Sequence, residues 1–268
     1  DSPPDEGRVH YHGNLILRSD GDPSISQAFM RQPANPVGLF DEWARNLIDS
    51  GIVYVHGDLI VDATAFGADQ NTYPLDVWEP HHRTYSYAPI PSAVAFNGNL
   101  IQINILPGMK NGNPGQVSVF PSTEGLVIDN RTQTQSSAAS AVSARFEEDA
   151  VTLRLTGRVK FGDSRQVVSL PLARPLEYVG AQMARALERQ GIRLVGEVRV
   201  ETMRAPGEEV QPLVRVIGTH EAPTLNRLLI EMMQESDNFL AEQIWMGVGA
   251  RAAGSGDRMS VRRLEQLW

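Results

Sequence analysis

The sequence has no cysteine, and only two of its 24 basic residues are lysine. The lack of cysteine excludes a disulfide framework, thiol catalysis and cysteine-based metal sites. No apolar run reaches the ~18 residues of a membrane-spanning helix. The first residues are polar and show no signal peptide, as would also be true of a mature exported protein. No basic block offsets the net charge of −8, so nucleic-acid binding is not expected.

What is present indicates a globular protein with a sizeable core. The chain has 268 residues, of which 41% are hydrophobic and 21% are charged. That length suits one large domain or two ordinary ones. We find no repeat typical of a solenoid or propeller.

The N-terminal third mixes short strands with one helix. Residues 13–18 (GNLILR) predict a strand that is closed by a turn at residues 19–23. Residues 37–50 predict an amphipathic helix that stops at Gly51, with one apolar stripe made of Phe40, Trp43, Ala44, Leu47 and Ile48. Two apolar runs, 52–55 and 59–61, then predict a strand pair turning at residues 56–58.

From Ala93 to Arg174 the pattern is typical of an all-β region. Residues 136–143 are small and are interpreted as a loop or an edge of a sheet. The candidate strands are residues 94–96, 100–105, 116–120, 126–130, 150–156 and 166–170.

Helical periodicity returns after Pro175. Residues 176–190 predict a helix with Val179, Met183 and Leu187 on its buried face. A second strand pair is expected around residues 192–195 and 197–201. Further helices are expected at residues 223–235, 239–248 and 260–268, with Leu225, Leu228, Leu229 and Met232 forming the apolar stripe of the first.

Between two of these helical runs lies Ser236-Asp237-Asn238, a Ser-x-Asn motif. In one class of acyl-serine enzymes this motif accompanies Ser-x-x-Lys and Lys-Thr-Gly. Neither companion occurs here, because the residues three positions before Lys110 and Lys160 are proline and glycine. A simpler interpretation is that Ser236 or Asp237 caps the helix that begins near Asn238.

With its flanking segments, this motif resembles the D-alanyl-D-alanine carboxypeptidase/endopeptidase family, the low-molecular-mass class C penicillin-binding proteins. Matching segments run from about Gly13 to Trp268. By the resemblance, Ser-x-x-Lys would lie upstream of Asp1 and Lys-Thr-Gly beyond Trp268. The quoted segments are 13–18 with 21–24, 57–62 with Phe66, 87–89, 92–93, 97–99 and 235–242.

The resemblance implies an α+β, multidomain architecture. Residues 1–170 would form a β-rich insertion, with a second nested subdomain at about 93–150. Residues 171–268 would form part of the α/β penicillin-binding, serine β-lactamase-like transpeptidase domain. Residues 171–268 alone are expected to be poorly stable, because their helices would lack the sheet on which they pack.

The resemblance also implies site residues. Ser236 would relay a proton and Asn238 would bind the substrate backbone, with Asp237 turned into structural hydrogen bonds. Trp78, Tyr85 and Tyr87 would line a substrate pocket, since aromatic rings offer stacking area with a polar tip. These aromatics could equally anchor an irregular loop to its own small core.

Two further patterns do not indicate a metal site. His81 and His82 are adjacent and have no third ligand at a suitable spacing. The segment Asp20-Gly21-Asp22 lacks most ligands of a calcium loop and predicts a turn. No metal or other cofactor is expected.

The implied activity is that of a serine-type D-Ala-D-Ala carboxypeptidase or endopeptidase of the periplasm or cell envelope. Its partners would be peptidoglycan stem peptides and β-lactam antibiotics. Membrane association at the periphery is left open, and the oligomeric state is not predicted. Without the nucleophile, this polypeptide alone is expected to be inactive. The alternatives are a non-catalytic module that binds cell wall or a partner, and an enzyme whose motifs have decayed.

Overall fold

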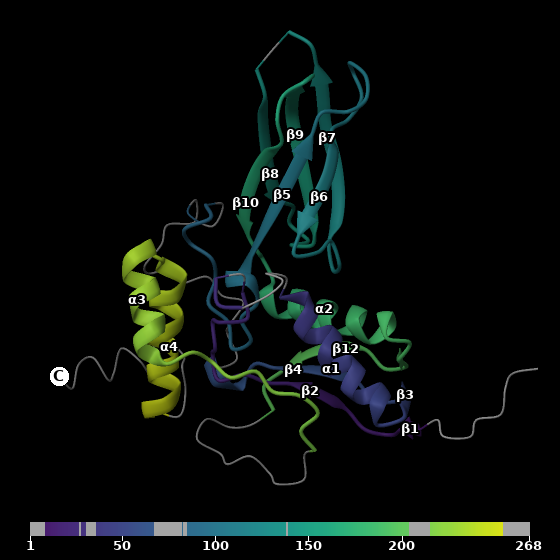
Figure 1. The fold of residues 1–268 in the computed structure, drawn as a ribbon, viewed down its shortest axis with the longest axis vertical. Helices are drawn as coiled ribbons and strands as arrows, with labels where there is room; N and C mark the ends of the chain where they lie inside the picture. The colour runs from purple at the N-terminus through teal and green to yellow at the C-terminus, as the bar shows by residue number, and fades with distance from the viewer. Residues whose placement is uncertain are drawn as a thin grey trace, which may run out of the picture.

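A computed structural model of the chain describes residues 9–26, 28–30, 36–66, 82, 85–137, 139–203 and 215–253. Figure 1 shows three parts: a body of short parallel strands and two helices, a β-sandwich that rises from it, and a pair of helices beside it. The fold is therefore α+β with several sheets, as the sequence predicts.

The body contains two three-stranded parallel sheets. In one sheet, β3 lies between β1 and β11, and in the other β4 lies between β2 and β12. The two expected strand pairs are wrong, because consecutive strands β3 and β4 belong to different sheets, as do β11 and β12. The strands are β1 (Val9–Tyr11), β2 (Leu15–Leu17), β3 (Ile52–Val55), β4 (Leu59–Asp62), β11 (Arg193–Leu194) and β12 (Val198–Glu201).

A line of glycines explains why these runs do not form hairpins. Gly57 follows β3, and a Cβ placed on it would lie 2.4 Å from the carbonyl oxygen of Gly13. Gly196 follows β11, and its Cβ would lie 2.4 Å from the carbonyl oxygen of Gly57. These glycines permit close approach of three neighbouring backbones, each of which continues forward into the second sheet.

Helices α1 (Val37–Asp49) and α2 (Pro175–Arg189) lie against each other and cover the sheets. Phe40, Ala44 and Leu47 of α1 are buried, as expected from the stripe in the sequence. Val179, Met183 and Leu187 of α2 are also buried, which confirms their predicted face. Because β11 and β12 pair with strands from before residue 66, this packing unit crosses the boundary expected at residue 170.

The β-sandwich contains one antiparallel sheet of order β10-β5-β6 and a second of order β7-β9-β8. Its inward positions alternate along the strands, and Ile101, Ile103, Ile105, Leu153 and Leu155 are fully buried between the sheets. The strands are β5 (Leu100–Leu106), β6 (Gln116–Phe120), β7 (Val127–Gln135), β8 (Ala141–Phe146), β9 (Thr152–Lys160) and β10 (Gln166–Pro171).

One detail of this region differs from expectation, and a second decides between two alternatives. Residues 94–96 are buried but irregular, and they lead into the short helical turn η3 (Asn97–Asn99). Residues 136–143 were expected as a loop or an edge of a sheet, and the edge strand β8 begins within them at Ala141, which confirms the second alternative for residues 141–143. The small side chains gave this strand a weak apolar alternation in the sequence. In the structure its inward positions are only half-buried.

The remaining helices form an antiparallel pair beside the body (Figure 1). In α3 (Leu225–Glu235) only Leu228 is buried, while Leu225 and Leu229 are exposed, contrary to their place in the predicted apolar stripe. Helix α4 (Asn238–Ala253) packs through Met246 on the turn η1 (Thr64–Phe66). The helix expected at residues 260–268 lies outside the described residues.

Candidate functional site

The Ser-x-Asn motif forms the corner between α3 and α4. Ser236 ends α3 in the left-handed conformation, with φ 52° and ψ 45°. The next amide, of Asp237, donates to the carbonyl of Met232 at 3.0 Å and so closes the end of the helix. A left-handed serine costs on the order of 1 kcal/mol, and Ser236 is exposed at this turn.

The three motif residues make different contacts. Asp237 caps α4, because its Oδ1 accepts from the amide of Leu240 at 3.0 Å. The capping interpretation thus applies to Asp237 and not to Ser236. No hydrogen bond to the Ser236 hydroxyl is found within the part of the chain that the structure describes.

Asn238 connects the corner to the aromatic segment. Its Nδ2 donates to the carbonyl of Tyr87 at 3.1 Å. Tyr87 stacks on Tyr85 with ring centroids 5.3 Å apart and an 8° angle between the planes, and its hydroxyl lies 2.5 Å from Nδ1 of His82. Of the five residues expected at the site, the structure therefore brings together Ser236, Asn238, Tyr85 and Tyr87. Trp78 lies outside the described residues.

A buried amide that sequence reasoning missed fixes the position of α4. Gln243 is fully buried, and its Nε2 donates to the carbonyls of Gly21 at 2.9 Å and Ser92 at 2.7 Å. Its Oε1 accepts from the amide of Ser92 at 3.1 Å. The one signal in the sequence is a glutamine inside the apolar run 239–248.

The Ser92 segment is itself fixed by a buried asparagine. Nδ2 of Asn99 donates to the carbonyl of Ile90 at 2.6 Å and to Oγ of Ser92 at 2.9 Å, while its Oδ1 accepts from the amide of Phe96 at 3.2 Å. Together Asn99 and Gln243 connect the helix pair to the root of the β-sandwich. Buried hydrogen bonds thus fix the position of the Ser-x-Asn motif relative to Tyr87.

A serine, a histidine and an aspartate also meet near the Asp-Pro turn. Ser24 Oγ lies 2.9 Å from Nε2 of His220, and Oδ2 of Asp22 lies 3.7 Å from the same nitrogen. In a catalytic triad the carboxylate binds the other ring nitrogen. Ser24 is also fully buried, so this cluster is not arranged as a catalytic triad and instead tethers residues 215–224 to the turn.

A buried carboxylate, that of Asp62, stabilises the sheet that contains β2 and β4. Asp62 is almost fully buried and accepts from Nε of Arg18 at 2.6 Å. Burial alone would raise the pKa of Asp62, but the hydrogen bonds from Thr64 and the ion pair with Arg18 outweigh burial and lower the pKa. Asp62 therefore stays charged and holds β4 to the strand segment that carries Arg18.

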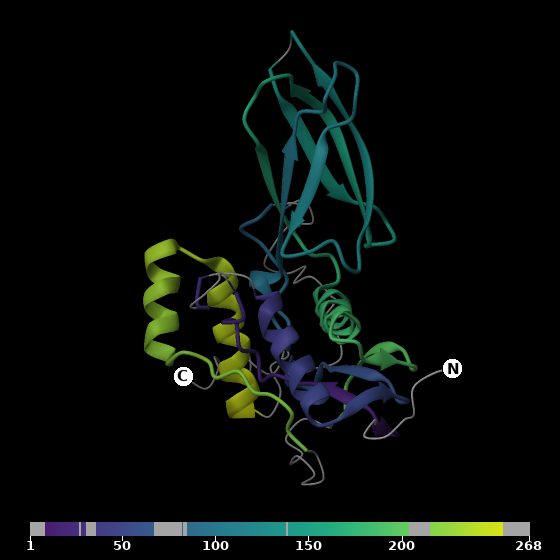
Figure 2. The same cartoon turned by 45° about the vertical axis from the view of Figure 1, so that its right-hand side comes forward.

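The described residues contain no lysine at the Ser236 corner. Lys110 follows β5 and Lys160 ends β9, so both lie at the end of the sandwich away from the body (Figure 2). Among these residues, no group of three histidine, aspartate or glutamate side chains is placed to hold a metal ion. None of the helices that are described is both long and apolar enough to cross a membrane.

Comparison with known proteins gives a family match and a curated relative. The sequence profile of the D-Ala-D-Ala carboxypeptidase 3 (S13) family matches residues 5–261. A D-alanyl-D-alanine carboxypeptidase of Actinomadura sp. (strain R39) is 25% identical over 253 residues, which cover 91% of this chain and 43% of that protein. The chain thus spans less than half of that relative.

Solved structures share the fold. Penicillin binding protein 4 from Haemophilus influenzae matches with a TM-score of 0.71 and 18% identity, over 97% of this chain and 54% of that one. A second structure of that protein, complexed with a β-lactam, matches with a TM-score of 0.64 and 18% identity, over 95% and 52% of the two chains. At this identity the likeness shows the fold alone.

Proposed function

The chain belongs to the D-Ala-D-Ala carboxypeptidase 3 (S13) family, and on that premise we propose that it is part of a serine-type D-Ala-D-Ala carboxypeptidase. The enzyme acts on peptidoglycan stem peptides in the cell envelope, through an acyl-serine intermediate, and is inhibited by β-lactams. One observation carries the proposal. The Ser236 hydroxyl stands exposed at a fixed helix corner, while Asn238 in the same turn binds the aromatic segment at Tyr87.

The roles follow from the chemistry of each side chain. A serine nucleophile needs a base, because its hydroxyl hardly ionises near neutral pH. Ser236 passes a proton toward the leaving group, for which an exposed hydroxyl that can rotate is suited. The Asn238 amide offers both a donor and an acceptor to the substrate backbone without adding charge. Asp237 shapes the corner by capping α4.

The stacked rings of Tyr85 and Tyr87 form one wall for the side chain of the stem peptide. They present apolar faces with polar tips, and Tyr85 and Tyr87 are 49% and 43% exposed. We propose Trp78 as a further residue of this pocket on the sequence resemblance alone, because it lies outside the described residues. The nucleophile and its lysine belong to a Ser-x-x-Lys sequence that this polypeptide does not contain, so we expect this chain alone to form no acyl-enzyme.

The domain boundaries follow the packing of the sheets. Helix α2 and strands β11 and β12 share a core with the N-terminal strands. We therefore assign residues 9–203 to the inserted region, with the sandwich nested inside it, and place the start of the catalytic part between β12 and α3. This proposed boundary differs from the boundary at residue 170 that the sequence predicts.

The test uses a full-length protein that contains this chain together with the two companion motifs. We expect Ser236→Ala and Asn238→Ala to lower the rate of D-alanine release by about 10²-fold or more, as is typical when a proton-transfer group is removed. Gln234→Ala, on the exposed side of α3, is the matched control and keeps full activity. Full activity of both motif variants would refute the assigned roles.

Intact mass separates the chain from the enzyme. A β-lactam adds one drug equivalent to the full-length protein and none to the polypeptide of 29.5 kDa. An adduct on this polypeptide would show that it carries its own nucleophile. No adduct on the full-length protein would overturn the acyl-serine proposal.

A further inference from the structure

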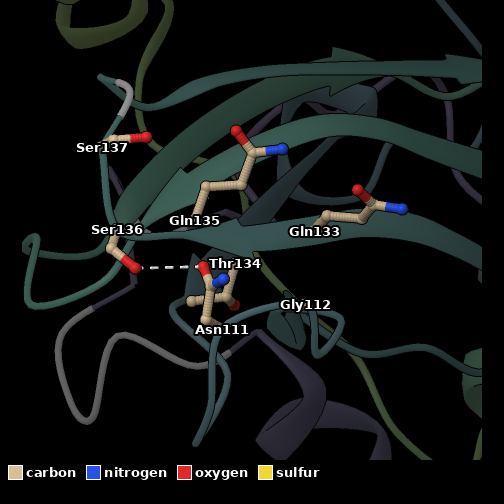
Figure 3. Close-up of a pocket in the computed structure, with 7 residues that line it drawn as sticks. All are labelled: Asn111, Gly112, Gln133, Thr134, Gln135, Ser136 and Ser137. Carbon is tan, nitrogen blue, oxygen red and sulfur yellow. Dashed lines mark hydrogen bonds between the residues drawn. The ribbon is translucent and has the colours of Figure 1, made fainter.

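The far end of the β-sandwich contains a polar recess of about 270 Å³. Its side chains are neutral amides and hydroxyls, which come from β7 and from the loops on either side (Figure 3). This volume is just below the ~300–1,000 Å³ of typical small-molecule sites. The lining residues are Asn111, Gly112, Gln133, Thr134, Gln135, Ser136 and Ser137.

The recess is built by the alternation of β7 and by backbone pairing. Gln133 and Gln135 project from the same side of the strand (Figure 3), whereas Thr134 between them is fully buried. Thr134 fixes the neighbouring loop, since its backbone accepts from the amide of Gly112 at 2.8 Å and donates to the carbonyl of Asn113 at 2.7 Å. The floor of the recess is therefore held by backbone hydrogen bonds, and the side-chain amides of Gln133 and Gln135 project from the other face of the strand.

The floor and wall are also joined by side chains. Oγ1 of Thr134 accepts from the amide of Gly108 at 2.7 Å. Ser136 donates to Oδ1 of Asn111 at 3.2 Å (Figure 3). A preformed polar site of this kind loses little conformational entropy when a ligand binds.

Three basic residues lie near these neutral groups. Arg158 and Lys160 of β9 are in register with Gln133 and Gln135 in a parallel pair. Paired residues lie on the same face of a sheet, on strands ~4.8 Å apart. Lys110 directly precedes Asn111 of the lining, so the main chain at Lys110 lies next to the recess.

These cations have no carboxylate partner among the residues that the structure describes. Arg158 donates only to the carbonyl of Ala139. Asp163 is a neighbouring carboxylate, since its amide donates to the carbonyl of Lys160, and its Oδ2 accepts from the hydroxyl of Ser140 at 2.6 Å. In a chain of net charge −8, a local group of exposed cations is a feature that favours an anionic ligand.

The opposite end of the same sheet is different. There Asp129 pairs with Arg131 and Arg154 at 3.0 Å each, and Glu147 pairs with Arg145 at 3.3 Å. Cations of this sheet are thus neutralised near the body and left unpaired at the recess. Phe161, which is 53% exposed, follows Lys160 and donates its amide to the carbonyl of Gln135.

We propose that this recess binds an anionic saccharide chain. The amides of Gln133, Gln135 and Asn111 bind sugar hydroxyls, because each amide both donates and accepts. Lys110, Arg158 and Lys160 bind the carboxylates or phosphates of the chain. The exposed ring of Phe161 offers an apolar face to a sugar ring.

The source of such a chain rests on the proposed function. A protein that acts on peptidoglycan would meet glycan strands with acidic stem peptides, or polyol chains joined by phosphate. Both present the same chemistry of hydroxyls with regular negative charge. A concave, polar site suits such a chain better than a lipid bilayer, which favours apolar insertion.

The experiment measures binding by titration calorimetry at low salt. The ligands are soluble glycan fragments with acidic peptides, a glycerol-phosphate polymer, and a neutral N-acetylglucosamine oligomer. We expect one or both acidic ligands to bind, weakening as salt is raised, and the neutral oligomer to bind at least 10-fold more weakly. Whichever acidic ligand binds identifies the source.

Two charge variants locate the binding, and a third variant tests the amides. K110Q/R158Q/K160Q is expected to weaken binding of the acidic ligand by at least about 10-fold, which is the loss of a single charge-assisted hydrogen bond or more. R131Q/R145Q/R227Q changes the net charge equally at other places and leaves the affinity within about 2-fold. Q133A/Q135A is expected to weaken the binding of the saccharide without altering the thermal stability of the sandwich.

Several outcomes would overturn the proposal: no binding of either acidic ligand at millimolar concentration, equal loss in the two charge variants, or binding only to phosphatidylglycerol vesicles. The last result would indicate a membrane-docking end. Because Ser236→Ala leaves the recess intact, binding by that variant distinguishes failure of this site from failure of the proposed enzyme activity.

Discussion

Replacing Gln243 by leucine tests how the Ser236 corner is held in place. Leucine is close to glutamine in size and favours a helix as strongly, so the change removes hydrogen bonds with little change in volume. Three backbone groups lose their partner: the carbonyl of Gly21 and both the carbonyl and the amide of Ser92. Gln243 itself is fully buried.

The magnitude follows from these three groups. A buried polar group without a partner costs about 1–3 kcal/mol, and a backbone shift or a water molecule recovers part of that cost. We therefore expect Gln243→Leu to lower the free energy of unfolding by about 3–5 kcal/mol. Because the lost bonds hold α4, part of the effect should appear as local opening of that helix.

Two measurements read this effect. Urea unfolding gives the global change, and amide hydrogen exchange over residues 238–253 gives the local one. Gln234→Leu is the matched control, since it makes the same change at an exposed position of α3. A loss below 1 kcal/mol together with unchanged exchange in α4, or a loss equal to that of the control, would refute the assigned role of Gln243.

Two other perturbations test the body of the protein. Gly57→Ala places a Cβ 2.4 Å from a backbone oxygen and should lower the free energy of unfolding by about 2 kcal/mol or more. The control Gly38→Ala lies in open space on α1 and should raise the free energy of unfolding by about 0.5–1 kcal/mol. Thermal melting compares the two variants, and equal effects would contradict the glycine argument. Desolvation and the charges of His12 and His10 lower the pKa of His56 in the folded protein below its ordinary value of 6.5. As pH falls below 6.5, His56 therefore takes up a proton in the unfolded chain before it does so in the folded one, and the stability of the fold decreases. The loss of Tm between pH 7 and 5 should be smaller in His12→Gln, and an unchanged slope would contradict the coupling.

The sequence by itself predicted the elements whose signal is local. The stripes of α1 and α2 were right because each helix buries one face along a single continuous segment. Most strands of the sandwich were right because inward and outward residues alternate. The Ser-x-Asn corner and the family were also evident, since they depend on residue identity and order.

Tertiary structure decided what depends on distant partners. Gly57 predicted a turn, yet it marks a close approach to Gly13 that only neighbouring parallel strands create. Gln243 bonds to residues 151 and 222 positions away, and no periodicity reveals such pairs. The two lysines gave no functional signal in the sequence, and the register of β7 and β9 placed Lys160 beside the recess. Local patterns report which face of a segment is buried, whereas the fold alone determines which segments meet there.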